Sequence, residues 1–234
     1  MDIRSLILKS DDDIVAVNKP AGLCTIMDGY DASLPYLAGL LQELFGRVWV
    51  VHRLDKETSG VVLFARNAPT HRALNIQFQL REIKKEYRAL VVGIPSWETN
   101  RISLPLKVNG DRSHRTVIDY QAGKPAETEV KVLQNFQGYS YLSAFPHTGY
   151  THQIRAHLAA TGFPLLQDPL YKSRLPETRF QIEAQKLLPS LPIHRCALHA
   201  VEITFHHPLT GENMSIQAPE PEDFIRTIQA LSRC

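Results

Sequence analysis

The chain has 234 residues, of which 44% are hydrophobic, and a formal net charge of +2. This length and composition are enough for a substantial buried core. No apolar run approaches the roughly 18 residues of a membrane helix, and the first residues lack the hydrophobic stretch and cleavage site of a signal peptide. Three widely separated cysteines without a CxxC pair favour a reduced, cytoplasmic setting. Many nucleic-acid-binding proteins are far more basic, so any RNA contact must come from local basic patches.

The first part of the chain is predicted to contain four strands and two helices. Ser33 is a candidate cap for the first helix, and Gly46 stands at its end. A Pro-Gly turn closes the first strand, and Tyr87 lies near the start of the last one. The predicted strands cover 13–22, 48–55, 60–66 and 84–93, and the predicted helices cover 33–46 and 70–80.

The second part begins with a polar region, 94–125, which contains a loop at 107–115. The remaining elements are a hairpin around Gln137-Gly138, a helix over 151–162, two strands within 199–218 and a helix over 220–234. No repeat or linker divides the chain. We therefore expect one α+β domain over residues 1–234, with mostly antiparallel strands and segregated helices.

The segment HRLDKETSG, residues 52–60, places Arg53 and Asp55 between two strand-like segments. A plain hairpin needs turn formers such as Asp55 and Gly60, but it has no need of an arginine beside them. Opposite charges between apolar strands are unfavourable unless paired, and they often mark a site. On residue type alone, Asp55 is a turn residue, Tyr87 a cross-strand core aromatic and Arg155 a surface charge on an amphipathic helix.

HRLDKETSG is similar to the HRLDxxTSG signature of the RluA-type pseudouridine synthases. Four more blocks resemble that family, in its order and at similar separations, and together they cover most of the chain. They are NKPAG (18–22), KKEYRALVVG (84–93), HTGYTHQIRAHLAATGFPLLQDPLY (147–171) and LHAVEITFHHPLTGE (198–212). Five ordered blocks make the resemblance specific, where one four-letter match would be weak.

The resemblance implies catalytic roles for Asp55, Tyr87 and Arg155. Asp55 would be the essential aspartate that acts on the target uridine. Tyr87 would stack against the uracil, and Arg155 would pair with Asp55 and hold it charged, because a nearby opposite charge favours the ionised carboxylate. Arg53 would help to displace the base by filling the space that it leaves.

The resemblance also implies a pseudouridine synthase fold: a long, mostly antiparallel mixed sheet flanked by helices and loops, with a central active cleft. The reaction would be the isomerisation of uridine in rRNA or tRNA. No S4 domain is expected, because NKPAG begins at residue 18. We expect a monomer in the cytoplasm with RNA, and neither DNA nor a membrane, as its partner. The expected RNA contacts are Arg53, Lys85, Arg115, Thr151 and His152, although for a basic patch taken alone solvated surface charge is an equal alternative.

Neither a metal nor a cofactor is expected. His147, His152 and His157 are five residues apart and do not share a helical face, and HRCALH (194–199) lacks a second ligand pair. No glycine-rich phosphate loop occurs. Two residues depart from the family pattern: Tyr150 replaces an arginine, and Gln167 stands where glycine is usual. Both weaken any RNA contact inferred from those positions.

The residue pattern leaves two other functions open. One is a catalytically idle RNA-binding or RNA-folding protein on the same scaffold, for which the intact catalytic three would be unnecessary. The other is a two-carboxylate glycoside hydrolase, which would need a second acidic residue near Asp55. The segment 172–195, with a short helix predicted over 178–188, is an equal candidate for RNA contact or for a cover over the sheet.

Overall fold

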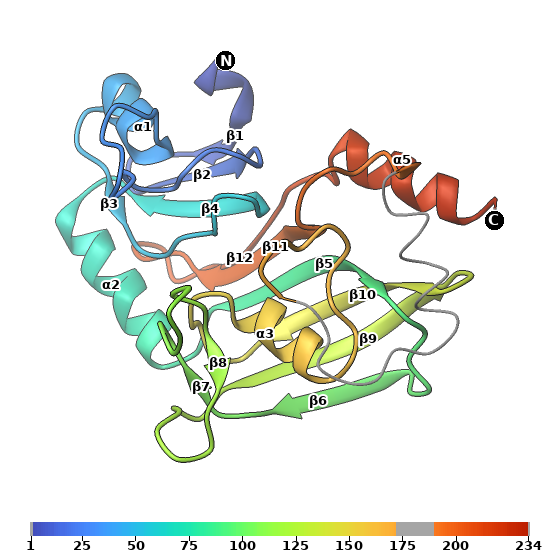
Figure 1. Cartoon of the computed structure of the whole chain (residues 1–234). Coiled ribbons are helices and arrows are strands. Elements are labelled where there is room, and N and C mark those ends of the chain that lie inside the picture. The colour runs from blue at the N-terminus through green and yellow to red at the C-terminus, as the bar shows by residue number, and fades with distance from the viewer. Residues whose placement is uncertain (1, 172–189, 234) are drawn as a thin grey trace. The chain divides into compact units, whose positions relative to one another are not determined.

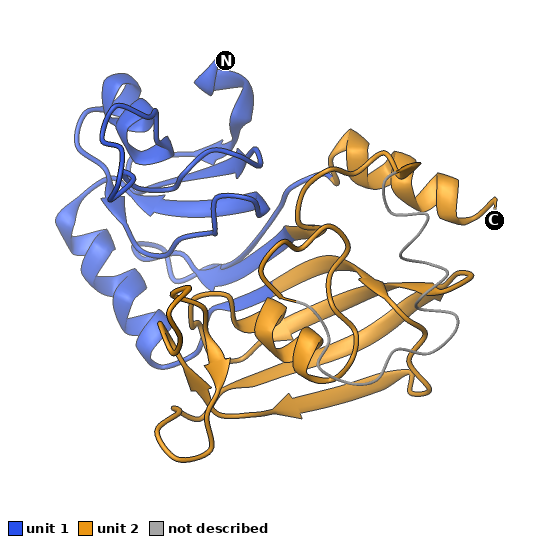
Figure 2. Ribbon diagram, viewed as in Figure 1, with its two compact units in different colours: residues 1–85, 200–219 blue, residues 86–199, 220–234 orange. Residues whose placement is uncertain are grey.

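The computed structural model describes residues 2–171 and 190–233. These residues form two compact units (Figure 2): unit 1 contains residues 1–85 and 200–219, and unit 2 contains residues 86–199 and 220–234. The helix predicted over 178–188 lies outside the described residues. Two strands, β5 (Lys84–Val92) and β11 (Leu198–His206), contribute residues to both units.

Unit 1 contains strands in the order β1-β2-β4-β11 (Figure 1), in which β1 pairs antiparallel with β2 and β2 pairs antiparallel with β4. β2 pairs with β4 from Ile14 opposite Ala65 to Lys19 opposite Gly60. All of β4 is buried, and so is nearly all of β2. The apolar residues of both strands, Ile14–Val17 and Val61–Ala65, therefore lie in the core. The bounds are β1 Ile7–Ser10, β2 Ile14–Lys19, β3 Trp49–Val50, β4 Ser59–Ala65 and β12 Asn213–Gln217, where β3 pairs with β4 and β12 with β11.

The helices of unit 1 are the 3-10 helix η1 (Ile3–Leu6), α1 (Leu37–Phe45) and α2 (Ala68–Gln79). The prediction that Ser33 caps α1 is wrong, because the N-cap residue is Tyr36 and no side chain caps it. Ser33 instead donates its hydroxyl to Asp31, at 2.6 Å. Pro35 explains the late start, since a proline disfavours the helical conformation of the residue before it.

Unit 2 contains antiparallel strands in the order β5-β10-β9-β6. The predicted hairpin is confirmed as β9 (Glu127–Asn135) and β10 (Tyr139–Pro146), joined by a turn in which Gly138 has a φ of 81°. The polar region 94–125, for which no strand was predicted, contains three. They are β6 (Thr99–Ser103), which pairs with β9, and the short pair β7 (Leu106–Lys107) and β8 (Val117–Ile118).

Two helices of unit 2 match their predicted positions. α3 (Gln153–Ala160) begins after His152, whose φ is 56°, and ends before Gly162, whose φ is 94°. α5 (Glu222–Leu231) is amphipathic and places Phe224 in the core of the unit. That core also contains Leu90, Val92, Phe136, Tyr139, Leu166, Leu191, Ile193, Ala197 and Leu231.

The α+β class is confirmed, with mostly antiparallel strands and separate helices. The assignment of residues 1–234 to one catalytic domain stays a prediction. Among the described residues, no helix has both the length and the hydrophobicity to cross a lipid bilayer.

Candidate active site

The segment around Asp55 forms a tight turn in unit 1. The N–H of Thr58 donates to the carbonyl of Asp55 at 3.1 Å, and Asp55 itself is half-buried. Leu54 is buried, and its backbone N–H and carbonyl both bond to the hydroxyl of Thr25, at 3.2 and 3.0 Å. Arg53 is exposed. The turn therefore fixes the backbone of Asp55 on a buried anchor, while its neighbour Arg53 faces solvent.

A buried lysine holds the same turn from the other side. Lys19 has no exposed surface, and its ammonium donates to the carbonyls of Pro20, Leu23 and Lys56 at 3.0, 2.8 and 3.1 Å. The N–H of Gly22 donates to the same carbonyl of Lys56, at 2.8 Å. A buried ammonium is tolerated when its protons are all bonded in this way. The NKPAG block thus supports the residue that follows Asp55.

His52, at the start of this segment, is hydrogen-bonded to β4, the strand that follows the turn. Its Nε2 accepts the N–H of Leu63 at 3.0 Å, and its ring lies 5.3 Å from that of Phe78. Burial of the ring, and then the charge of Lys85, lower the pKa of His52 to about 3. Burial also lowers the pKa of Lys85 to about 8. His52 is therefore neutral at pH 7, in the form that can accept this bond.

Gly60 allows two strands of unit 1 to approach closely. Its φ is 115°, and a Cβ at this position would lie 2.1 Å from the carbonyl oxygen of Ala200 in β11. No larger residue fits there without moving the backbone of one strand.

Tyr87 lies in the part of β5 that belongs to unit 2, opposite Ala144 of β10, and is buried. Its neighbours Glu86 and Arg88 alternate to the other face, as strand geometry requires. There Arg88 bonds to Glu86 and Ser143. The two faces of β5 therefore separate the proposed catalytic tyrosine from a polar network.

Arg155 is buried in α3 and makes a bidentate salt bridge that the sequence did not predict. Its Nε and Nη2 donate to the two carboxylate oxygens of Asp168, each at 2.8 Å. Its guanidinium carbon lies 5.0 Å from the ring centre of Tyr171. Asp55 is in unit 1 and Arg155 in unit 2, and their pairing stays a prediction.

Asp168 is itself held by several donors. Its Oδ1 accepts the N–H groups of Leu170 and Tyr171 at 2.9 and 3.1 Å, and the thiol of Cys196 lies 3.6 Å from Oδ2. Burial opposes ionisation, but the hydrogen bonds and charge of Arg155, together with the two N–H groups, lower the pKa of this carboxyl. The pair is therefore a buried carboxylate and a buried guanidinium, both charged.

Three of the predicted RNA contacts also lie in unit 2. Arg115 donates to Asp111 at 2.7 Å and to the carbonyl of Leu170 at 2.9 Å. The carbonyl of Thr151 accepts the hydroxyl of Thr116, and the ring of His152 lies in hydrogen-bond contact with the Tyr171 hydroxyl at 3.0 Å. Arg115 and His152 thus brace the segment that contains Asp168, and the contact of all three residues with RNA stays a prediction.

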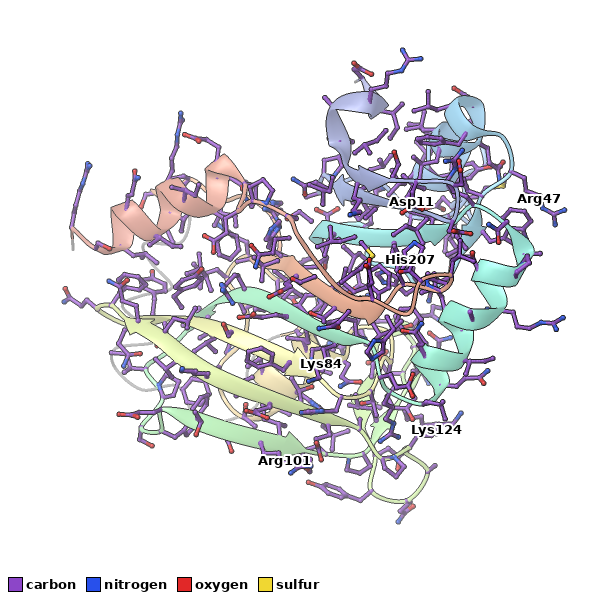
Figure 3. All side chains as sticks on the ribbon, turned by 180° about the vertical axis from the view of Figure 1, so that it is seen from behind. Asp11, Arg47, Lys84, Arg101, Lys124 and His207 are labelled. Atoms are coloured by element: carbon purple, nitrogen blue, oxygen red, sulfur yellow. The ribbon has the colours of Figure 1, made fainter. Side chains whose placement is uncertain are left out.

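One group of side chains of metal-ligating types occurs among the described residues: Asp11, Asp13 and His207 in unit 1. Figure 3 labels Asp11 and His207. His207 Nε2 lies 3.4 Å from Asp11, and its Nδ1 accepts the N–H groups of Leu209 and Thr210. The carboxylates of Asp11 and Asp13 also accept hydrogen bonds, from backbone N–H groups and from side chains respectively. These hydrogen bonds are sufficient to explain why the three side chains lie together, because each one holds a neighbouring turn.

Comparison with known proteins identifies the family. The model of the family described as RNA pseudouridylate synthase matches residues 13–160, well over half of the chain. The chain belongs to this family. Two relatives are the ribosomal large subunit pseudouridine synthase D of Neisseria meningitidis, 36% identical over 96% of this chain, and synthase C of Yersinia pestis, 35% identical over 99%. The chain spans 60% of the length of the Neisseria protein and 70% of the Yersinia protein.

Solved structures support the pseudouridine synthase fold. Human RNA pseudouridylate synthase domain containing 4 matches with a TM-score of 0.75 and 23% identity, over 98% of this chain and 94% of that one. Human RNA pseudouridylate synthase domain containing 1 matches with a TM-score of 0.71 and 24% identity. At these identities the likeness establishes the fold.

Proposed function

We propose that this protein isomerises uridine to pseudouridine in structured RNA. The observation that carries the proposal is the family match over residues 13–160, which contains Asp55, Tyr87 and Arg155. In the reaction the N-glycosidic bond of the uridine breaks, the uracil rotates, and a carbon–carbon glycosidic bond forms at C5. The product has the same atoms as the substrate, so neither an oxidant nor a hydrolytic water is consumed.

Asp55 is the proposed catalytic aspartate. Its support is a backbone turn fixed by Lys19 and Thr25, which leaves the side chain half-buried next to an exposed Arg53. A fixed backbone favours catalysis because a reacting group must be aimed before the reaction begins. Tyr87 is proposed to stack on the uracil, and Arg155 to hold Asp55 in its ionised form. Arg53 is proposed to fill the space of the displaced base.

Ribosomal RNA is the first substrate class to test, with tRNA second. The names of the Neisseria and Yersinia relatives refer to the large ribosomal subunit. Lys85, Arg115, Thr151 and His152 are further proposed RNA contacts. Contacts of lysine and arginine with phosphates position RNA without reading its sequence, so the choice of uridine must come from RNA shape and from bases near the target. We propose that the protein acts as a monomer in the cytoplasm.

The test incubates the purified protein with ribosomal RNA and, separately, with tRNA, both transcribed in vitro and therefore unmodified. New pseudouridines are then mapped by chemical labelling and primer extension. Site-specific pseudouridine in one of them supports the proposal. RNA binding without any new pseudouridine in either would instead favour the catalytically idle RNA-binding protein.

A further inference from the structure

Asp168 lies thirteen residues beyond Arg155 and reaches it through a fold-back of the chain. α3 carries Arg155, ends at Ala160 and is followed by Gly162 with a positive φ. The segment after it returns to the sheet: the N–H of Leu166 donates to the carbonyl of Leu90 in β5 at 2.9 Å, and the carbonyl of Leu166 accepts the N–H of Ala197 at 3.0 Å. Asp168 is thus presented by a segment that is anchored in the core of unit 2.

The geometry of the pair restricts the guanidinium in both position and plane. A bidentate bond through Nε and Nη2 fixes the planar group along one edge, because two parallel hydrogen bonds leave no freedom of rotation. The ring of Tyr171 covers the group, and Tyr171 is itself fixed by hydrogen bonds of its hydroxyl to the N–H of Thr116, at 2.8 Å, and to His152. The side chain of Asp168 has no exposed surface, and that of Arg155 is 5% exposed.

We propose that Asp168 is a positioning residue of the active site, which acts on the reaction only by holding Arg155 in one orientation. This inference rests on the proposed function for the role of Arg155. It assigns a role to a residue outside the catalytic three. Asp168 itself touches neither the RNA nor the reacting atoms.

Among residues 2–171 and 190–233, three titratable groups are recorded beside this carboxylate. From α3 comes Arg155, from the fold-back comes the hydroxyl of Tyr171, and from the segment before β11 comes the thiol of Cys196. Of these, only Arg155 carries a charge near neutral pH. Of these three groups, Arg155 is therefore the one most affected when the charge of Asp168 is removed.

The main variant is Asp168→Asn. An asparagine keeps the shape and can still accept the N–H groups of Leu170 and Tyr171, but its amide nitrogen cannot accept a guanidinium proton. We expect kcat on the mapped RNA substrate to fall 10- to 100-fold with KM within threefold of wild type. Asp223→Asn is the matched control, because Asp223 makes the other bidentate arginine pair among the described residues of unit 2, with Arg195 at 2.7 and 3.0 Å. That control should keep the wild-type kcat.

Two further measurements separate positioning from simple loss of stability. In the Arg155→Ala background, Asp168→Asn should lower kcat no further, because a residue that acts through Arg155 has nothing left to position. Asp168→Glu keeps the buried charge but moves the carboxylate by one methylene. It should therefore retain most of the thermal stability and still lose at least 10-fold in kcat, even if Asp168→Asn fails to fold.

A readout without turnover is the NMR signal of the Arg155 Nε–Hε group, assigned by its absence in Arg155→Lys. Its exchange with water should be slow in the wild type and in Asp223→Asn, and fast in Asp168→Asn or Asp168→Glu. Wild-type kcat in a folded Asp168 variant, additive losses in the Arg155→Ala background, or unchanged exchange would overturn the inference. If the wild-type protein modifies no RNA, the proposed function fails, and the NMR signal still decides whether Asp168 holds Arg155.

Discussion

The ammonium group of Lys19 donates a hydrogen bond to the carbonyl of Lys56, the residue directly after Asp55. Two motifs that are more than thirty residues apart therefore meet at one backbone group. The N–H of Gly22 bonds to the same carbonyl. The turn that presents Asp55 is thus supported by side chain and backbone of a neighbouring loop within unit 1.

Lys19→Met should destabilise the protein and reduce turnover together. Methionine fills a similar volume but leaves three carbonyls without the ammonium as donor, at about 1–3 kcal/mol for each buried group that stays unsatisfied. We expect the unfolding free energy to fall by about 2–4 kcal/mol in urea denaturation. Lys9→Met, at an exposed lysine of β1, is the control and should stay within about 0.5 kcal/mol. Wild-type stability of Lys19→Met would show that the turn does not depend on this clamp.

Asp55→Asn should abolish pseudouridine formation while leaving the fold and the RNA affinity nearly intact. The substitution is close to isosteric, but it removes the carboxylate on which the proposed mechanism depends. The measurements are pseudouridine formation in single-turnover assays, filter binding of the same RNA, and the thermal unfolding midpoint. Appreciable turnover by this variant would refute the assignment of Asp55.

Arg53→Ala should impair the modification of structured RNA more than that of an unstructured strand. An exposed arginine that fills the space of a displaced base offsets an unstacking cost of a few kcal/mol, and that cost is small in a single strand. We expect turnover on a folded substrate to fall at least 10-fold, with no change in protein stability. Arg72→Ala, at an exposed arginine of α2, is the matched control. Equal losses on both RNA forms would contradict this role.

The stability of unit 1 should fall in mild acid because of His52. Its pKa is lowered from 6.5 to about 3, so between pH 6.5 and 3 the unfolded chain binds a proton at His52 that the folded chain does not bind. The unfolding free energy should therefore decline as the pH falls from 6.5 towards 3, by at most about 5 kcal/mol. His52→Gln should flatten this part of the pH–stability curve in urea denaturation. A parallel curve for the variant would assign the acid sensitivity to other groups.

Gln167→Gly should stabilise the protein slightly. Gln167 has a φ of 56°, a left-handed conformation that costs a residue with a Cβ about 1 kcal/mol or more and that glycine adopts readily. Part of this gain is offset by the greater freedom of glycine in the unfolded chain, so we expect a net gain of about 0.5 kcal/mol. Gln42→Gly, at an exposed position within α1, should instead destabilise by about 1 kcal/mol. A loss of stability at position 167 would indicate that its side-chain contacts outweigh the strain.

Strong local patterns explain which elements the sequence predicted correctly. β4 contains the unbroken apolar run Val61–Ala65, and the β9–β10 hairpin turns at Gly138, so both can be predicted without tertiary information. β6 has the sequence TNRIS, in which only Ile102 is buried. Such a polar edge strand exists because β9 offers it backbone partners, and no local signal reports that.

The partner of Arg155 illustrates what the family pattern left out. The resemblance implied that Arg155 pairs with Asp55, and the structure shows a salt bridge between Arg155 and Asp168. A signal was present, since Asp168 is the one acidic residue between His147 and Tyr171 and stands among apolar residues. An isolated carboxylate in such a run needs a partner. Which cation would meet it depends on how the chain returns after α3, and that is a property of the fold.

Gly60 is the last residue of the HRLDKETSG segment. A glycine is required there because a Cβ at this position would clash with the backbone of Ala200. Position 60 is therefore constrained by folding alone, whether or not Asp55 performs chemistry. A descendant of this chain that had lost its activity would still have to keep the glycine while being free to change the aspartate. In a survey of genomes, the final letter of this segment reports how two strands are spaced, whereas Arg53 and Asp55 are the letters that the proposed function constrains.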